Sequence, residues 1–281
     1  MPGRFAKKVA IITGSSFGIG RETALLFAKE GAKVTVTGRN EERLEGTKKA
    51  LIDAGIPESN YLIVPADITT SAGQDSLISE TLNKFGKINI LVNNAGASLP
   101  DAQKKFGIDQ GVDTYEKVMK LNVQSVIEMT QKVRPHLAKS KGEIVNVSSV
   151  VALKFGFART PYYPLAKAAL DQYTRSAAID LIAEGIRVNT VNPGIVQTGF
   201  LGSATGMSGD ACQEFYDNMG SNPSVVPVGF SGRPDHIAKA IAFLADRDSS
   251  EYIIVSLYLW ILTHKFFRTF IVNSFSLYTR Q

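Results

Sequence analysis

Short apolar runs rich in β-branched residues recur along the chain, and longer amphipathic stretches separate them. Runs of this length are typical of strands that are buried on both faces in a parallel sheet. The predicted strands lie at 9–12, 33–37, 61–64, 88–92, 143–147 and 187–191, and the predicted helices at 20–30, 41–54, 115–138, 166–183 and 234–245. Strands and helices in alternation require right-handed crossovers, which cover both faces of the sheet. The sequence therefore predicts an α/β fold of the doubly wound, Rossmann type, with a parallel sheet between two layers of helices.

Length, composition and charge narrow the classes of protein to consider. The chain has 281 residues, of which 44% are hydrophobic and 20% charged, as in an ordinary globular protein. No linker-like segment occurs before residue 250, so we predict one domain over 1–254 and an atypical tail over 255–281. The net charge of +5 is spread along the chain instead of forming a basic stripe, which argues against nucleic-acid binding.

Cysteine usage and the apolar segments bear on location. Cys212 is the only cysteine, so no intrachain disulfide can form, which fits a reducing compartment. The first apolar run is too short for a signal-peptide core, and no run reaches the roughly 20 residues needed to span a membrane. We therefore predict a cytoplasmic protein. The histidines show no metal-ligand spacing, and no metal is predicted; they are His136, His236 and His264.

A glycine-rich segment follows the first predicted strand and opens the first predicted helix. Its glycines allow a tight turn and let the backbone approach a pyrophosphate at a helix N-terminus, where free N–H groups and the helix dipole favour anions. The strand before it and the helix after it favour a dinucleotide site over a turn without a ligand. The residues expected to contact the cofactor here are Thr13, Gly14, Ser16, Phe17, Gly18, Ile19 and Gly20.

The end of the second predicted strand bears on which cofactor is bound. A NAD-preferring site usually carries an acidic side chain there for the adenosine ribose, whereas this chain has Arg39. An arginine is placed to meet a 2′-phosphate, so we predict that NADP(H) is preferred, with NAD(H) as the alternative; a solvated loop arginine is the competing interpretation. Asp67, after the third strand, is expected either to receive the adenine amino group or to cap the next helix.

Tyr163 and Lys167 stand four residues apart, a spacing that places both on one face of a helix. A free tyrosine has a pKa of about 10, and a neighbouring ammonium lowers that pKa because it stabilises the phenolate. The pair can therefore supply an acid–base tyrosine at neutral pH, although the spacing alone also fits a surface pair. Tyr162 falls off the shared face and is predicted to take no part.

Six motifs in order resemble the classical short-chain dehydrogenase/reductase family over about residues 5 to 254. They are 13–20, 93–96, Asn122 within 121–123, 144–149, 163–167 and 193–194. The resemblance implies an NAD(P)-dependent enzyme that acts on CH–OH groups and interconverts a carbonyl and an alcohol of a small-molecule substrate by hydride transfer. It also implies a homo-oligomer.

The resemblance implies a role for each candidate catalytic residue. Tyr163 corresponds to the general acid/base, and Lys167 to the lysine that lowers the tyrosine pKa and holds the nicotinamide ribose. Ser149 corresponds to the serine that polarises the substrate oxygen, and Asn122 to the asparagine that organises a relay water. The cofactor contacts implied outside the glycine loop are Asn94, Ala95, Gly96, Tyr163, Lys167, Pro193, Gly194 and Thr198. Of these, Asn94 and Gly96 are expected to act more as scaffold than in chemistry.

The segment 198–232 combines glycine, serine and asparagine with apolar side chains such as Phe200, Met207 and Phe230. This composition predicts a lid with an apolar lining. A lipophilic substrate is one interpretation, and apolar burial of the lid against the body is the other.

The resemblance stops near residue 254. The family would continue with a glycine, whereas residues 252–281 contain neither glycine nor acid. Of three interpretations we favour a last strand within 252–262; membrane contact and a terminal sequence that differs from the mature product are the others.

Two other functions are weighed. A nucleotide-binding regulator or scaffold would keep the fold and lose turnover because of the altered end. A sugar-nucleotide epimerase or dehydratase would share the tyrosine–lysine pair, but the glycine spacing 14, 18 and 20 favours the reductase branch.

Overall fold

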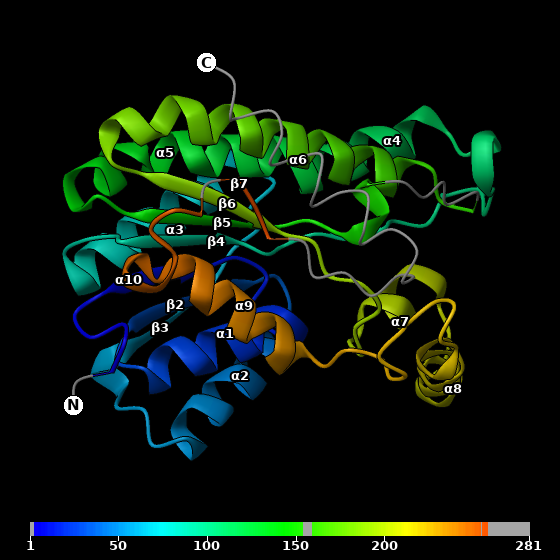
Figure 1. Ribbon diagram of the computed structural model, residues 1–281, viewed down its shortest axis with the longest axis horizontal. Helices are drawn as coiled ribbons and strands as arrows, with labels where there is room; N and C mark the ends of the chain where they lie inside the picture. The colour runs from blue at the N-terminus through cyan, green and yellow to red at the C-terminus, as the bar shows by residue number, and fades with distance from the viewer. Residues whose placement is uncertain (1–2, 154–158, 254, 258–281) are drawn as a thin grey trace.

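The computed structural model describes residues 3–153, 159–253 and 255–257, and a seven-stranded parallel sheet forms its centre (Figure 1). The strand order is β3-β2-β1-β4-β5-β6-β7. The strands are β1 (Val9–Ile12), β2 (Lys33–Gly38), β3 (Tyr61–Pro65), β4 (Ile90–Asn93), β5 (Glu143–Val147), β6 (Arg187–Val191) and β7 (Val255–Leu257). The order reverses between β1 and β4, which is where open α/β sheets bind ligands. The predicted doubly wound fold is confirmed.

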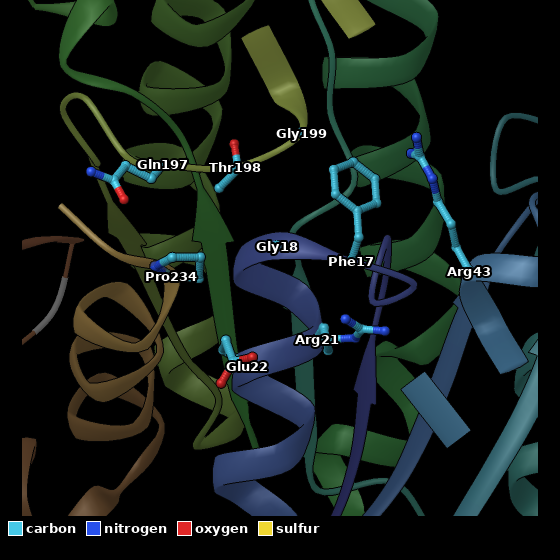
Figure 2. A pocket seen from close by; sticks show the side chains of 9 residues that line it. All are labelled: Phe17, Gly18, Arg21, Glu22, Arg43, Gln197, Thr198, Gly199 and Pro234. Carbon is cyan, nitrogen blue, oxygen red and sulfur yellow. The ribbon is translucent and has the colours of Figure 1, made fainter. Parts of the chain in front are cut away.

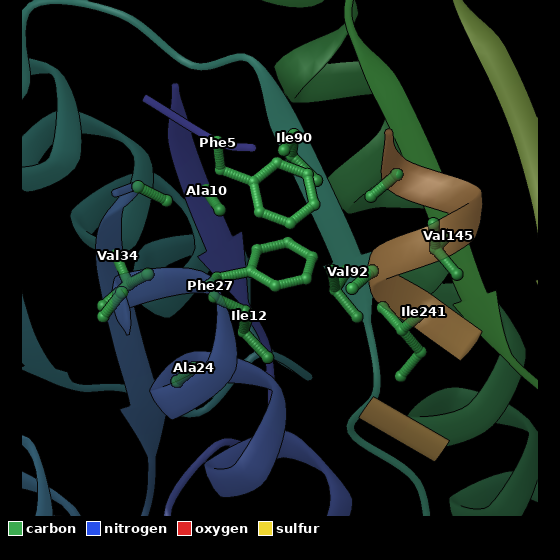
Figure 3. Packing of buried hydrophobic residues seen from close by; sticks show 14 of the residues in the cluster. Phe5, Ala10, Ile12, Ala24, Phe27, Val34, Ile90, Val92, Val145 and Ile241 are labelled. Carbon is green, nitrogen blue, oxygen red and sulfur yellow. The ribbon is translucent and has the colours of Figure 1, made fainter. Parts of the chain in front are cut away.

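Helices cover both faces of the sheet (Figure 1). One layer contains α1 (Gly18–Lys29), α2 (Glu41–Asp53) and α9 (Pro234–Ala245), and the other contains α3 (Ser71–Phe85), α5 (Ser125–Ser140) and α6 (Tyr162–Leu181). Side chains alternate along a strand, so Ile12 of β1 packs in the first layer and Ile11 in the second. In the first layer the rings of Phe5 and Phe27 stack with their centroids 4.4 Å apart (Figure 3).

Shorter elements complete the chain. They are α4 (Val112–Met119), α7 (Phe200–Thr205), α8 (Gly209–Ser221), α10 (Arg247–Ser250), the 3-10 turns η1 (Glu58–Asn60), η2 (Gly107–Asp109), η4 (Val150–Ala152) and η5 (Ile182–Glu184), and the π-helical segment η3 (Lys120–Gln124). Helices α7 and α8 lie in the predicted lid and stand beyond the carboxyl ends of the strands (Figure 1). Among the described helices, none combines the length and apolar character that crossing a bilayer requires.

The strand predictions hold better than the helix predictions. All six predicted strands are present, with ends shifted by two residues at most. The favoured last strand within 252–262 is present as β7, but Tyr252 is 96% exposed and the strand begins only at residue 255. Residues 254 and 258–262 of that run, and His264, lie outside the described residues. Helix α3 was not among the predicted ranges, because small and polar residues dominate its sequence.

The helix predicted over 115–138 is wrong in one respect, since it is broken into α4, η3 and α5. The side chain of Asn122 explains the break. Its Nδ2 donates to the carbonyl oxygens of Val118 and Ala97, both at 2.9 Å. The side chain thereby occupies the Val118 carbonyl oxygen, which in a regular α-helix would accept from a backbone N–H group. One-turn π segments of this kind occur frequently at functional sites.

A buried polar cluster holds the amino ends of β5 and β6. The Arg187 side chain is 2% exposed, and its Nε lies 2.9 Å from Glu143 Oε2. The same guanidinium donates to the carbonyl oxygens of Leu244, Ser250 and Ile253. Arg247 Nε donates to the other Glu143 oxygen at 2.8 Å. The cluster thereby ties two strands to the segment that leads into β7.

Candidate active site

The loop between β1 and α1 is shaped by its glycines. Gly14 and Gly18 have φ angles of +62° and +59°, in the left-handed region that glycine adopts readily. A Cβ on Gly14 would lie 2.7 Å from the Cα of Ala95, and a Cβ on Gly20 would lie 2.5 Å from Asn94 Nδ2. The loop therefore packs against the loop after β4 with no room for side chains.

Thr13 and Asn94 brace these two loops at the point where the strand order reverses. Thr13 Oγ1 accepts hydrogen bonds from the backbone N–H groups of Asn94 and Ala95, both at 3.0 Å. Asn94 Nδ2 donates in return to the carbonyl oxygens of Thr13 and Gly14, both at 2.9 Å. The two side chains are thus used within the protein, which fits the scaffold role expected of Asn94, whereas Thr13 was expected to contact the cofactor.

The first turn of α1 offers an anion site. Its N-cap residue is Phe17, whose side chain makes no capping bond, and the turn contains no acidic residue, so its N–H groups and the helix dipole face the loop uncompensated. Arg43 of α2 stacks over the Phe17 ring, with its guanidinium carbon 4.6 Å from the centroid. Ser16 is buried and Ile19 is half-buried beside the same loop.

A pocket of about 420 Å³ opens beside this turn (Figure 2). Its lining residues are Phe17, Gly18, Arg21, Glu22, Arg43, Gln197, Thr198, Gly199 and Pro234. Thr198 lies close to the glycine loop, since its Cγ2 is 3.4 Å from where a Gly18 Cβ would stand. The Tyr216 hydroxyl fixes Thr198 by donating to its carbonyl oxygen at 2.9 Å.

Arg39 and Asp67 face each other across the ends of β2 and β3. The Arg39 side chain is 69% exposed, and its Nη1 lies 3.8 Å from Asp67 Oδ2. Burial raises the pKa of Asp67, but hydrogen bonds from Thr69 and the charge of Arg39 outweigh it and hold the pKa below its ordinary value. The capping role predicted for Asp67 is wrong, because Thr70 is the N-cap of α3 and accepts from the Gly73 N–H at 3.1 Å.

The structure brings Tyr163, Lys167, Asn122 and Gly96 together. Lys167 Nζ lies 5.7 Å from the Tyr163 ring centroid and donates to the Val147 carbonyl oxygen at 2.8 Å. A Cβ on Gly96 would stand 2.6 Å from Asn122 Oδ1 and 3.0 Å from Lys167 Nζ, so the glycine makes room for both. Asn122 Oδ1 is buried and has no hydrogen-bond partner among the described residues.

The two serines after β5 point to different surroundings. Ser148 is buried, and its hydroxyl donates to the Lys167 carbonyl oxygen at 3.3 Å. Ser149 is half-buried, and its side chain acts on the Tyr163 hydroxyl by lowering the pKa of that phenol. The structure therefore places Ser149, the serine chosen from the sequence, at the tyrosine.

Burial opposes charge on both partners of the tyrosine–lysine pair. It raises the pKa of Tyr163, and the Ser149 side chain opposes the rise, so the lowering by Lys167 that the sequence predicted is not found. Burial also lowers the pKa of Lys167 to about 8, against the opposing effect of the Asp171 carboxylate. At neutral pH the pair is therefore a neutral phenol beside a lysine that is mostly charged.

The remaining predicted residues surround this centre. The Pro193 carbonyl oxygen accepts from the Val150 N–H at 3.0 Å, and Gly194 follows it, half-buried. Phe200 of α7 lies against Tyr163, with ring centroids 5.3 Å apart. Tyr162 points elsewhere, since its hydroxyl donates to the Gln110 carbonyl oxygen at 2.8 Å.

The structure adds residues that the sequence reasoning missed. Asp171 and Asn192 are buried and hydrogen-bonded to each other behind the tyrosine–lysine pair, and Arg43 lines the pocket at the glycine loop. Asp171 could have been found, since it stands four residues after Lys167 on the same helix. Arg43 and Asn192 carry no comparable signal.

These residues suit a dinucleotide. The uncapped helix turn fits a pyrophosphate, and the unpartnered Asn122 oxygen beside Lys167 fits a polar ligand or water at the other end of the site. The family model described as short chain dehydrogenase matches residues 8–208. The chain belongs to the short chain dehydrogenase family. It is therefore an oxidoreductase of a family that uses NAD(P)(H) and acts on alcohol and ketone groups.

Solved structures and curated relatives agree with this membership. A short-chain dehydrogenase/reductase of Caenorhabditis elegans, solved with cofactor, is 56% identical with a TM-score of 0.89 and covers 91% of this chain and 94% of its own. Glucose dehydrogenase of Caenorhabditis elegans in the apo form is 50% identical with a TM-score of 0.74, covering 91% and 97%. The (2S)-[(R)-hydroxy(phenyl)methyl]succinyl-CoA dehydrogenase subunit BbsD of Thauera aromatica is 35% identical, covering 86% and 90%.

Proposed function

We propose that this short chain dehydrogenase interconverts a carbonyl and an alcohol with NADP(H), and that Tyr163 is its general acid/base. The observation that carries the proposal is the convergence of four side chains. The Ser149 side chain acts on the Tyr163 hydroxyl, and Lys167 lies beneath the tyrosine ring and meets Asn122 at Gly96. A proton donor, a hydrogen-bond donor and a cation at one place fit a reaction that builds negative charge on an oxygen.

Each side chain has a defined task in this proposal. In reduction the Tyr163 hydroxyl protonates the substrate oxygen, and in oxidation the phenolate removes that proton. Lys167 stabilises the phenolate by its charge, and the Ser149 hydroxyl donates to the same substrate oxygen. Asn122 Oδ1 is free to hold a water that returns protons through Lys167. When bound, the nicotinamide supplies or accepts the hydride.

Replacing Tyr163 by phenylalanine tests the assignment. Tyr163→Phe keeps the ring and removes the proton, so we expect turnover to fall by about 10²- to 10⁴-fold while NADPH binding stays near wild type. Tyr162→Phe is the matched control, because its hydroxyl is engaged with Gln110. Activity retained in Tyr163→Phe would refute the role. Wild-type cofactor binding without turnover on any substrate would favour the scaffold alternative, which the comparisons do not support.

The preference for NADP(H) rests on charge around the adenosine end. Arg39 directly follows β2 and Arg43 lines the nearby pocket, and no acidic side chain takes the usual ribose-binding place after β2. Two arginines favour a 2′-phosphate. Steady-state kinetics with NADPH and NADH decide the preference, and a higher kcat/KM with NADH would overturn it.

The substrate class is proposed only as a carbonyl or alcohol. The lid exposes Val228 and Phe230 at 59% and 54%, which supports a lipophilic substrate, whereas the relative named glucose dehydrogenase supports a sugar. We propose a panel of aldoses, cyclic ketones and acyl thioesters, followed by NADPH oxidation. Sugar turnover without ketone turnover would exclude the lipophilic proposal.

A homo-oligomer in the cytoplasm remains part of the proposal. Leu165 and Ile179 of α6 and Ile182 of η5 are 50%, 76% and 40% exposed, and an apolar face of this kind fits contact with a second copy. The single cysteine, Cys212, fits a reducing compartment. Sedimentation and fluorescence localisation test the two points separately.

A further inference from the structure

Asp171 is a buried carboxylate that the proposed reaction does not use. It is 3% exposed and stands one turn after Lys167 on α6. Its Oδ2 accepts a hydrogen bond from Asn192 Nδ2 at 2.9 Å, and its Oδ1 has no partner among the described residues. Burying a carboxylate costs free energy unless it is compensated, so this residue calls for a functional explanation.

Asn192 connects this carboxylate to the serine turn. The same Nδ2 that donates to Asp171 also donates to the Ser149 carbonyl oxygen at 3.1 Å. Next in the chain, the Pro193 carbonyl accepts from Val150. Asn192, which follows β6, thus holds the backbone that carries the Ser149 hydroxyl. Asp171 in turn holds the side-chain amide of Asn192 in place.

The charges around Asp171 set its influence on the site. Lys167 and Arg175, both on α6, are the charged groups that act on it, whereas the β5 and β6 sides contribute the neutral Ser148 and Asn192. Burial raises the pKa of Asp171, and the hydrogen bonds and the two cations oppose that rise. Its negative charge favours the ammonium form of Lys167, which burial disfavours.

We propose that Asp171 is a positioning residue for the reaction, which holds the Ser149 turn through Asn192 and keeps Lys167 charged beside Tyr163. The proposal rests on the proposed function of Tyr163 and Lys167. It separates two effects, one geometric through Asn192 and one electrostatic through Lys167.

Asp171→Asn tests the electrostatic effect. An amide oxygen can still accept from Asn192, and the amide NH₂ takes the place of Oδ1, so the charge is removed while the hydrogen bond from Asn192 is kept. Lys167 then loses its proton at lower pH, and the phenolate of Tyr163 is less stabilised. For alcohol oxidation we expect the ascending limb of kcat/KM against pH to move about one unit higher, and the rate at pH 7 to fall about threefold to tenfold.

A second readout does not depend on turnover. Ultraviolet absorbance follows phenolate formation in the cofactor-free protein, and the difference between Asp171→Asn and the double variant Asp171→Asn/Tyr163→Phe isolates Tyr163. The titration midpoint of Tyr163 obtained in this way should lie at a higher pH than the midpoint obtained from the difference between wild type and Tyr163→Phe. Asp180→Asn removes a carboxylate from the exposed side of α6 and is the matched control, expected to leave both readouts unchanged.

Asn192→Ala tests the geometric effect and also serves if Asp171→Asn does not fold. It should lower kcat about tenfold because the Ser149 turn loses its support, without the shift of the pH limb. Asp171→Asn with an unshifted limb and an unshifted tyrosine midpoint would overturn the proposal, and so would full kcat in Asn192→Ala. If the wild type shows no turnover, the proposed function fails, while the tyrosine titration still decides the role of Asp171.

Discussion

The two ends of the sheet both bury polar side chains, but they leave them in different states. At the amino ends, Arg187 and Glu143 pair with each other at 2.9 Å, and Arg247 and three carbonyl oxygens take up further bonds. At the carboxyl ends, Asn122 and Asp171 each keep a buried oxygen without a partner among the described residues. At the amino ends the buried charges lie against opposite charges, whereas the two buried oxygens at the carboxyl ends face no partner among the described residues.

The difference follows from what each end has to do. An unpartnered buried oxygen costs free energy, so it persists where a ligand or water completes it or where its charge is needed. A cluster in which opposite charges face each other, as Arg187 Nε and Glu143 Oε2 do at 2.9 Å, contributes only to holding elements in place. We therefore expect changes at the amino end to affect stability, and changes at the carboxyl end to affect turnover.

The largest expected effect is that of Arg187→Met at the amino end. The methionine leaves Glu143 with Arg247 alone and leaves three carbonyls, two of them buried, without this donor, so we expect the free energy of unfolding to fall by about 3–5 kcal/mol. Urea unfolding measures it. Turnover per folded molecule should stay near wild type, and a loss of turnover at unchanged stability would break the contrast between the ends.

Gly96→Ala at the carboxyl end should show the opposite pattern. Its methyl group would displace Asn122 Oδ1 or Lys167 Nζ, which are ends of side chains and can move into the site. We expect kcat/KM to fall about 100-fold, equivalent to about 2.7 kcal/mol, with little change in Tm. Gly209→Ala, where a Cβ meets nothing within 4 Å, is the control. A clear fall in Tm that accompanies the loss of kcat/KM would show that Gly96 is needed for the stability of the fold and not for the site alone.

Asp101 sharpens the comparison, because it lies in the loop after β4 but is fully bonded. Its Oδ2 accepts from the Gly111 N–H at 2.8 Å and the Thr114 hydroxyl at 3.0 Å, and its Oδ1 accepts from the Gln103 N–H at 2.9 Å. The bond from Gly111 is the main cause that lowers the pKa of Asp101 to about 2. We expect Asp101→Asn to lower Tm at pH 7 with a smaller effect on turnover than Gly96→Ala.

The pH dependence of that loss has a definite sign. A folded pKa of about 2 lies below the ordinary value of 3.8, so the ionised carboxylate stabilises the fold above about pH 4. The stabilisation is lost as the pH falls from about 4 to about 2. Thermal melts of wild type and Asp101→Asn should therefore differ at pH 7 and converge over this range. A difference in Tm that persists at pH 2 would contradict the proposed cause.

The sequence was sufficient for the strands and for the candidate catalytic side chains, because both depend on local signals. Short β-branched runs mark the strands, and a four-residue spacing on one helix brings Tyr163 to Lys167. The break at Asn122 was not predictable, since it depends on the carbonyl of Ala97, 25 residues away. The link from Asn192 to Asp171 likewise joins β6 to α6 and exists only once the chain is folded.

The π-helical segment η3 also sets a rotational register for the site. An α-helix turns by about 100° per residue, so the wider turn at Lys120–Gln124 fixes the angle at which α5 continues from α4. Removing one residue from the segment would restore a regular ladder and rotate every later side chain of α5 against the core. Either Asn122 would lose its hydrogen bond to the Ala97 carbonyl oxygen, or α5 would lose its packing against the sheet. Insertions and deletions in homologous chains should therefore avoid these five positions even where substitutions are accepted.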